Sequence, residues 1–152
     1  MTGHAKLRIA IGAFHDVTGL RDALDGLGAI GCSGDDIVLL LGPGAFDGQL
    51  EQQLAGINDT SAGSIRTLRR GSKEIAPEQR QAKHPAPTQD QVLHFETWLP
   101  SQYTRDLDDH LGRGGCVLFC TALSETMEQA LTKVLLQYSE APVQLHDLPG
   151  AN

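Results

Sequence analysis

The chain has 152 residues, of which 12 are basic and 19 acidic, and its formal net charge of −7 argues against general affinity for nucleic acid or anionic membrane. This length suits one domain whose core folds without metals or disulfides. The three cysteines lack metal-type spacing, and the sequence shows neither a signal peptide nor an apolar run of membrane-spanning length. We therefore expect a cytoplasmic protein without membrane insertion.

The first part of the chain, residues 7–41, reads as a strand, an amphipathic helix and a second strand. Thr18 is a plausible helix cap, and Gly31 is a natural helix end. The helix between them carries apolar side chains at helical spacing: Leu20, Leu24, Leu27 and Ile30. The second strand, residues 37–41, is apolar at every position, so both of its faces should be covered.

Residues 42–97 form a long insert. Apolar residues at helical spacing predict a short helix over 45–57. Residues 58–90 are polar and charged and read as an arm or long loop that contains a possible short strand over 64–70. Residues 92–95 are predicted to form a further strand.

The arm carries half of the chain's 12 basic residues. They are Arg66, Arg69, Arg70, Lys73, Arg80 and Lys83. A cationic arm on an acidic body predicts docking to an acidic protein surface or uptake of an anion. The alternative is a solvated loop without a partner.

The last part, residues 98–147, repeats the strand, helix and strand pattern behind one extra helix. Apolar spacing predicts that extra helix from about Ser101 to Gly112. A strand over 116–121 follows, and Ser124 then caps a helix over 125–138. A final apolar strand opens at Pro142.

Two such units predict one α+β domain over residues 1–152, a ferredoxin-like β-α-β / β-α-β sandwich. The insert 42–97 separates the half-units 7–41 and 98–147. Right-handed crossovers place both repeat helices on one face of a four-stranded sheet. The strand over 37–41 then lies at a sheet edge, where a segment over 64–70 or a second copy of the chain should cover it.

Several short motifs resemble a known family. The run Gly31–Ile37 (GCSGDDI), Tyr103, the pair Gly114-Gly115 and the dipeptide His146-Asp147 resemble the bacterial general stress protein family of the heat-induced type, which has a small ferredoxin-like domain. The resemblance covers residues 7–41 and 98–147. It implies that fold and a link to stress, and it supplies no catalytic residue.

The short glycine motifs Gly42-Pro43-Gly44 and Gly112-Arg113-Gly114-Gly115 could present amides to a phosphate, but neither follows a P-loop or dinucleotide fingerprint. A helix end followed by a tight strand entry explains them better. His94 and Glu96 would share a strand face and could ligate or exchange protons, although solvated surface positions are the simpler interpretation.

Cys116 and Cys120 fall on one strand face, too far apart to bond, and read as core residues. We predict no catalytic residue, metal site or cofactor. The sequence favours a non-enzymatic accessory or binding protein that acts through its insert and a sheet edge, on another protein or by self-association. The alternatives are a small-ligand sensor for a nucleotide or anion, similar to the nitrogen-regulatory signalling proteins, and a small ferredoxin-like enzyme with a pocket lined by His94, Tyr103 or Trp98.

Overall fold

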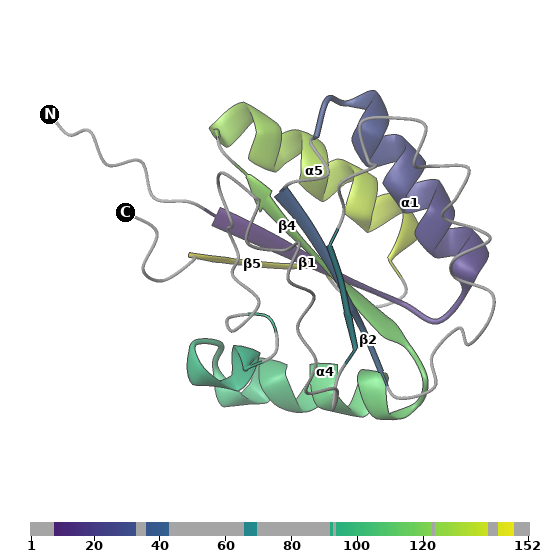
Figure 1. Ribbon diagram of the computed structural model, residues 1–152. Helices are drawn as coiled ribbons and strands as arrows, with labels where there is room; N and C mark the ends of the chain where they lie inside the picture. Colours follow the sequence, from purple (N-terminus) through teal and green to yellow (C-terminus); the bar gives the residue numbers. More distant parts are fainter. Residues whose placement is uncertain are drawn as a thin grey trace, which may run out of the picture.

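The computed structural model is an α+β protein in which helices lie on both faces of one sheet (Figure 1). It describes residues 8–32, 36–42, 66–69, 92, 94–122, 124–139 and 143–147. The predicted helix over 45–57 and most of the arm over 58–90 lie outside these residues. Within the described part of the chain, no helix combines the length and apolar character needed to cross a bilayer.

Within the described residues, the sheet has five strands in the order β3-β2-β4-β1-β5. The strands are β1 (Arg8–Phe14), β2 (Ile37–Leu41), β3 (Arg66–Arg69), β4 (Cys116–Ala122) and β5 (Gln144–Asp147). Strand β4 pairs antiparallel with both β1 and β2, and β5 pairs antiparallel with β1. The sheet therefore joins strands from the two ends of the sequence at its centre.

The outer edge of β2 is covered by β3, which pairs with it in parallel from Val38 opposite Arg66 to Leu41 opposite Arg69. An uncovered apolar edge strand would leave a row of unpaired main-chain groups ready to pair with another chain. The predicted cover by a segment within 64–70 is thus confirmed, and β2 is an internal strand. The sheet has a fifth strand that the predicted four-stranded arrangement did not count.

Two helices, α1 (Val17–Ala29) and α5 (Glu125–Tyr138), lie together on one face of the sheet (Figure 1). Helix α1 is capped by Asp16, whose Oδ1 accepts a hydrogen bond from the Thr18 amide at 3.1 Å, rather than by Thr18 itself. An aspartate is a strong helix cap because its side chain accepts from the unpaired amides of the first turn. The predicted cap of α5 is confirmed, since Ser124 Oγ accepts from the amide of Met127 at 3.1 Å.

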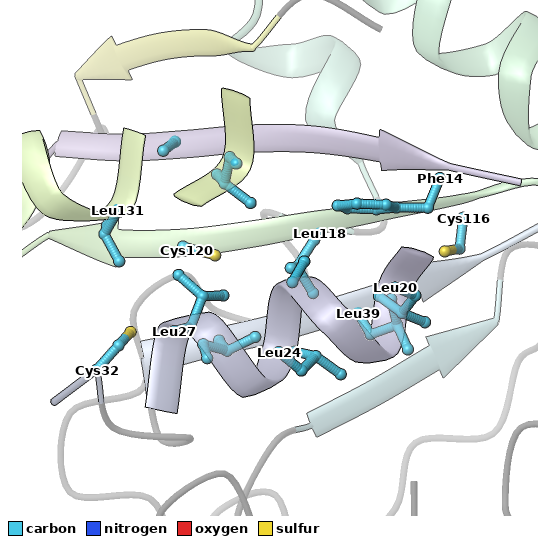
Figure 2. Close-up of a cluster of buried hydrophobic side chains, with 14 of the residues drawn as sticks. Phe14, Leu20, Leu24, Leu27, Cys32, Leu39, Cys116, Leu118, Cys120 and Leu131 are labelled. Atoms are coloured by element: carbon cyan, nitrogen blue, oxygen red, sulfur yellow. The ribbon is translucent and has the colours of Figure 1, made fainter. Parts of the chain in front are cut away.

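The first core lies between these helices and the sheet (Figure 2). Leu24 and Leu27 of α1 and Leu131 of α5 pack against alternate residues of the strands, among them Leu39 and Leu118. These two strand residues lie opposite each other in the β2–β4 register. Strands β2 and β4 are buried on both faces, as predicted for β2. The residues that alternate with Leu39 and Leu118 face a second core on the other side of the sheet.

The second core is covered by helix α4 (Ser101–Gly112) and the short 3₁₀ helix η4 (Phe95–Thr97). The predicted strand over 92–95 is wrong. Val92, Phe95 and Leu99 are all buried in this core, and their spacing of three and four residues is helical rather than alternating. Phe95 packs against Phe119 of β4 with ring centroids 6.3 Å apart.

The C-terminal end of α4 packs directly on the main chain just after β2 and just before β4. The amide of Gly42 donates a hydrogen bond to the carbonyl of Gly115 at 3.0 Å. A Cβ at Gly42 would overlap the carbonyl oxygen of Leu111 and lie 2.8 Å from its carbon. Because main-chain atoms cannot swing aside as a flexible side chain can, this contact requires glycine.

We therefore expect Gly42→Ala to destabilise the protein by about 1–3 kcal/mol, as overpacking does in a close-packed interior. Gly112→Ala is the matched control, because its Cβ would meet nothing within 4 Å and it lies in the last turn of α4. The control should be stabilising by about 0.5–1 kcal/mol, since alanine is the better helix former. Urea unfolding measures both, and equal midpoints for the two variants would contradict this packing.

Candidate functional site

A pocket of about 350 Å³ lies between α4 and the outer part of the sheet, where β1 and β5 meet. We call it the α4/β5 pocket. Its volume is at the lower end of the range of about 300–1,000 Å³ that small-molecule sites occupy.

One wall of the α4/β5 pocket is a single face of α4. Tyr103, Asp106, Leu107 and His110 line it, and their spacing of three, four and seven residues brings them together on one side of a helix. Leu107 is buried in the second core, which fixes this face against the sheet. The three polar side chains beside it are left partly or fully exposed along the pocket.

The floor of the α4/β5 pocket comes from the sheet. Ile11 of β1 belongs to the second core and lies opposite Gln144 of β5, while His146 lies opposite Ile9. Cross-strand partners point to the same face of a sheet, so Gln144 and His146 face α4. The intervening Leu145 packs against the first core on the other face.

Strand β5 pairs only with Arg8–Ile11 of β1. Beyond that point the hydroxyl of Ser139, just after α5, replaces the missing strand. Its Oγ accepts from the Ala13 amide at 3.0 Å and donates to the Ala13 carbonyl at 3.3 Å. The main-chain amide and carbonyl of Ala13 are thereby satisfied, and Gly12 and Ala13 also line the pocket.

His110, which lines the pocket, is fixed in place by main-chain contacts. Its Nε2 lies 2.9 Å from the carbonyl oxygen of Phe14 and 3.1 Å from that of Cys116. Both partners are acceptors, so Nε2 carries the proton and donates to them, which leaves Nδ1 of the neutral ring as an acceptor. The ring also packs edge-on against His15 with centroids 4.1 Å apart, and a Cβ at Gly115 would overlap it.

His146 has a perturbed titration. Burial lowers the pKa of its imidazole below the ordinary value, the positive charge of Arg8 lowers it further, and the carboxylate of Asp147 opposes this. Its Nε2 lies 3.0 Å from Gln144 Oε1 and donates to it. The ring is also packed edge-on against Tyr103 with centroids 5.1 Å apart, so the helix and the sheet meet directly across the pocket.

The cysteine side chains are buried in the first core, on the other face of the sheet from this pocket. Cys32, Cys116 and Cys120 are free thiols in the first core (Figure 2). Burial raises the pKa of Cys32 to about 12 and that of Cys120 well above its ordinary value, and nearby Asp36 adds to both shifts. A thiol held protonated is a poor nucleophile and a poor metal ligand. The core role predicted for Cys116 and Cys120 is confirmed.

Other residues singled out in the sequence lie elsewhere. His94 and Glu96 form an exposed pair, with Nδ1 and Oε2 3.5 Å apart, at the start of η4 rather than on a strand. In the run 112–115, Gly114 adopts a φ of +87° after α4, and Arg113 pairs with Asp109 at 3.0 Å. This run is a helix end before a strand, as predicted. Among the described residues, no group of three His, Cys, Asp or Glu could hold a metal ion.

The structure places two of the six predicted partner-binding residues. Arg66 and Arg69 begin and end β3, at the edge of the sheet beyond β2. The other four, Arg70, Lys73, Arg80 and Lys83, lie outside the described residues.

The α4/β5 pocket draws on residues that sequence reasoning did not connect. Tyr103 was a candidate for a pocket, but Asp106 and Gln144 were not considered. A signal for them exists, because Asp106 shares a helical face with Tyr103 and His110, and Gln144 alternates with His146. Which helix face meets which strand depends on the tertiary arrangement, which this signal does not contain.

Comparisons of the chain with protein-family models, with curated proteins and with solved structures find no match. The site is therefore interpreted from its own geometry.

The lowered pKa of His146 makes stability depend on pH. The folded state holds this imidazole neutral more strongly than the unfolded chain does. The contribution of His146 to folding stability is therefore complete above pH 6.5, and it is lost as the pH falls through the lowered pKa of the folded state. Arg8→Gln should raise the pKa of His146 toward that of free histidine. An NMR titration of the His146 ring protons measures this shift. Arg21→Gln is the control, because Arg21 is an exposed residue of α1. An unchanged midpoint in Arg8→Gln would contradict the role of Arg8.

Proposed function

We propose that the protein binds a small organic ligand in the α4/β5 pocket. The observation that carries this proposal is the convergence of polar side chains from a helix and a strand over an apolar floor. Tyr103 and Asp106 come from α4, Gln144 and His146 come from β5, and Ile11 lies beneath them. A concave site with an apolar base and a few fixed polar groups is the usual form of a small-molecule site.

The hydrogen bonds of the two imidazoles in the pocket favour binding over catalysis. The proton of His110 is directed at two main-chain carbonyls, and that of His146 at Gln144. Neither arrangement resembles a nucleophile held by a base that a third group orients. Of the three residues suggested for an enzyme pocket, Tyr103 lines this one, whereas His94 and Trp98 do not.

The finer fold assignment is part of the same proposal. The order β2-β4-β1-β5, with α1 and α5 on one face, supports a ferredoxin-like sandwich to which β3 and α4 are added. In such a sandwich the face opposite the repeat helices is available for a site, and here α4 lies over it. The resemblance to heat-induced stress proteins adds the expectation that binding is linked to stress.

Equilibrium dialysis of the full chain against a defined metabolite mixture, followed by mass spectrometry, tests the proposal. We expect at least one compound to be retained by the native protein and lost in Gln144→Trp, because the larger side chain would fill the pocket. Gln129→Trp is the matched control, since Gln129 is exposed on α5 and does not line the α4/β5 pocket. Equal retention by both variants would place binding elsewhere, and no retention by the native protein would contradict the proposal.

A second candidate is the accessory role through the basic arm. One observation favours it: Arg66 and Arg69 lie on β3, the last strand at that side of the described sheet. A strand at an edge can present charge to a partner from a rigid base. Arg70, Lys73, Arg80 and Lys83 would extend that charge along the arm.

The accessory role predicts that the full chain binds an acidic polypeptide such as poly-L-glutamate. Replacing Arg66, Arg69 and Arg70 together by Ser should weaken binding and flatten its dependence on salt, because fewer charges are screened. Fluorescence anisotropy over a salt series measures both quantities. Unchanged affinity and slope in the triple variant would leave the arm as a solvated loop.

A further inference from the structure

We infer that the α4/β5 pocket selects an organic cation, a protonated amine on a compact apolar body. This inference rests on the proposed binding function and names the chemical class of its ligand. Three features of the pocket support it: its formal charge, the state of its imidazoles and the aromatic face of Tyr103.

The first feature is charge. Among the described residues that line the pocket, Asp106 is the only one with a formal charge at neutral pH. It lies on the exposed side of α4, one turn after Tyr103. A carboxylate at the pocket rim attracts an ammonium group and repels a carboxylate or phosphate. The net charge of the whole chain, −7, acts in the same direction at longer range.

The second feature is that the two imidazoles are committed as donors elsewhere. The Nε2 proton of His110 is shared by the carbonyls of Phe14 and Cys116, and that of His146 is donated to Gln144. In a neutral imidazole whose Nε2 donates, the one other ring nitrogen, Nδ1, is an acceptor. The lowered pKa of His146 keeps that ring uncharged at neutral pH. Together with the carboxylate of Asp106, such acceptor nitrogens suit a ligand that carries N–H donors.

The third feature is the ring of Tyr103. It lines the pocket one helical turn from Asp106 and packs edge-on against His146. An aromatic face binds a cation through its quadrupole, and the interaction strengthens as water is excluded. The apolar side chains of Ile11 in the floor and Leu107 in the α4 wall then accommodate the body that carries the amine.

Three matched probes test the ligand class: benzylamine, benzyl alcohol and benzoate. They share one ring and differ chiefly in charge. Each is titrated into the ¹⁵N-labelled full chain, with chemical shifts of the pocket residues as the readout. We expect benzylamine to bind about fivefold more tightly than benzoate, because the carboxylate of Asp106 attracts the ammonium group and repels the carboxylate.

Two variants assign the selectivity to one side chain. Asp106→Asn should abolish most of the preference for benzylamine, whereas Asp108→Asn makes the same charge change on the same helix outside the pocket lining and should preserve it. Benzoate binding as tightly as benzylamine, or equal loss in both variants, would overturn the cation inference and leave the pocket as a ligand site. If none of the three probes shifted the pocket resonances, the proposed function would fail as well.

Discussion

The fold depends on excluding water from both faces of β4, in which all seven residues are buried. A strand of this kind cannot lie on the surface of a two-layer protein, because one of its faces would remain wet. Helices α1 and α5 cover one face, and their side chains form the first core with Leu118 and Cys120 (Figure 2). The other face, with Val117 and Phe119, requires a separate cover. That requirement explains why the protein has a third layer.

Helix α4 and η4 supply this layer, and the pocket follows from how they fit. The buried side of α4 holds Leu107 and Leu111 against the second core, and His110 attaches it to the main chain of β1 and β4. Because β5 is only four residues long and pairs only with Arg8–Ile11, it leaves a gap in the sheet beside the last residues of β1, near His110 in the last turns of α4. The pocket occupies this gap. Its polar lining is therefore a consequence of covering a wide apolar face with a helix that extends beyond the fully paired strands.

Much of the secondary structure could be predicted from local patterns. The apolar run of β2 indicated burial on both faces and the need for an edge cover, and the spacing in α4 gave its bounds closely. Local patterns failed over 92–95, where β-prone residues such as Val92 and Phe95 are placed at helical spacing on one core. Tertiary packing overrode the propensity of these residues.

The pocket could not be predicted because it joins distant parts of the chain. Tyr103 and His146 are 43 positions apart in the sequence (146 − 103), and their rings meet only because α4 packs over β5. The six basic residues of the arm are the opposite case, in which the sequence alone shows a cluster. They form an evident cluster in the sequence, yet only Arg66 and Arg69 belong to the part of the chain that the structure describes. A cluster in sequence indicates a surface, whereas a pocket depends on register and on which helix face is buried.

The central claim is that α4 and β5 enclose a shared site, and one NMR measurement tests it most directly. In a NOESY spectrum of the full chain, the ring protons of Tyr103 and His146 should show cross-peaks, since their ring centroids are 5.1 Å apart. Cross-peaks from the ring of His110 to protons of Phe14 and Cys116 should accompany them, because the imidazole is held at their carbonyls. A Tyr103 ring without contact to His146, in a spectrum that retains the His110 contacts, would show α4 in place with the pocket absent and would contradict the account.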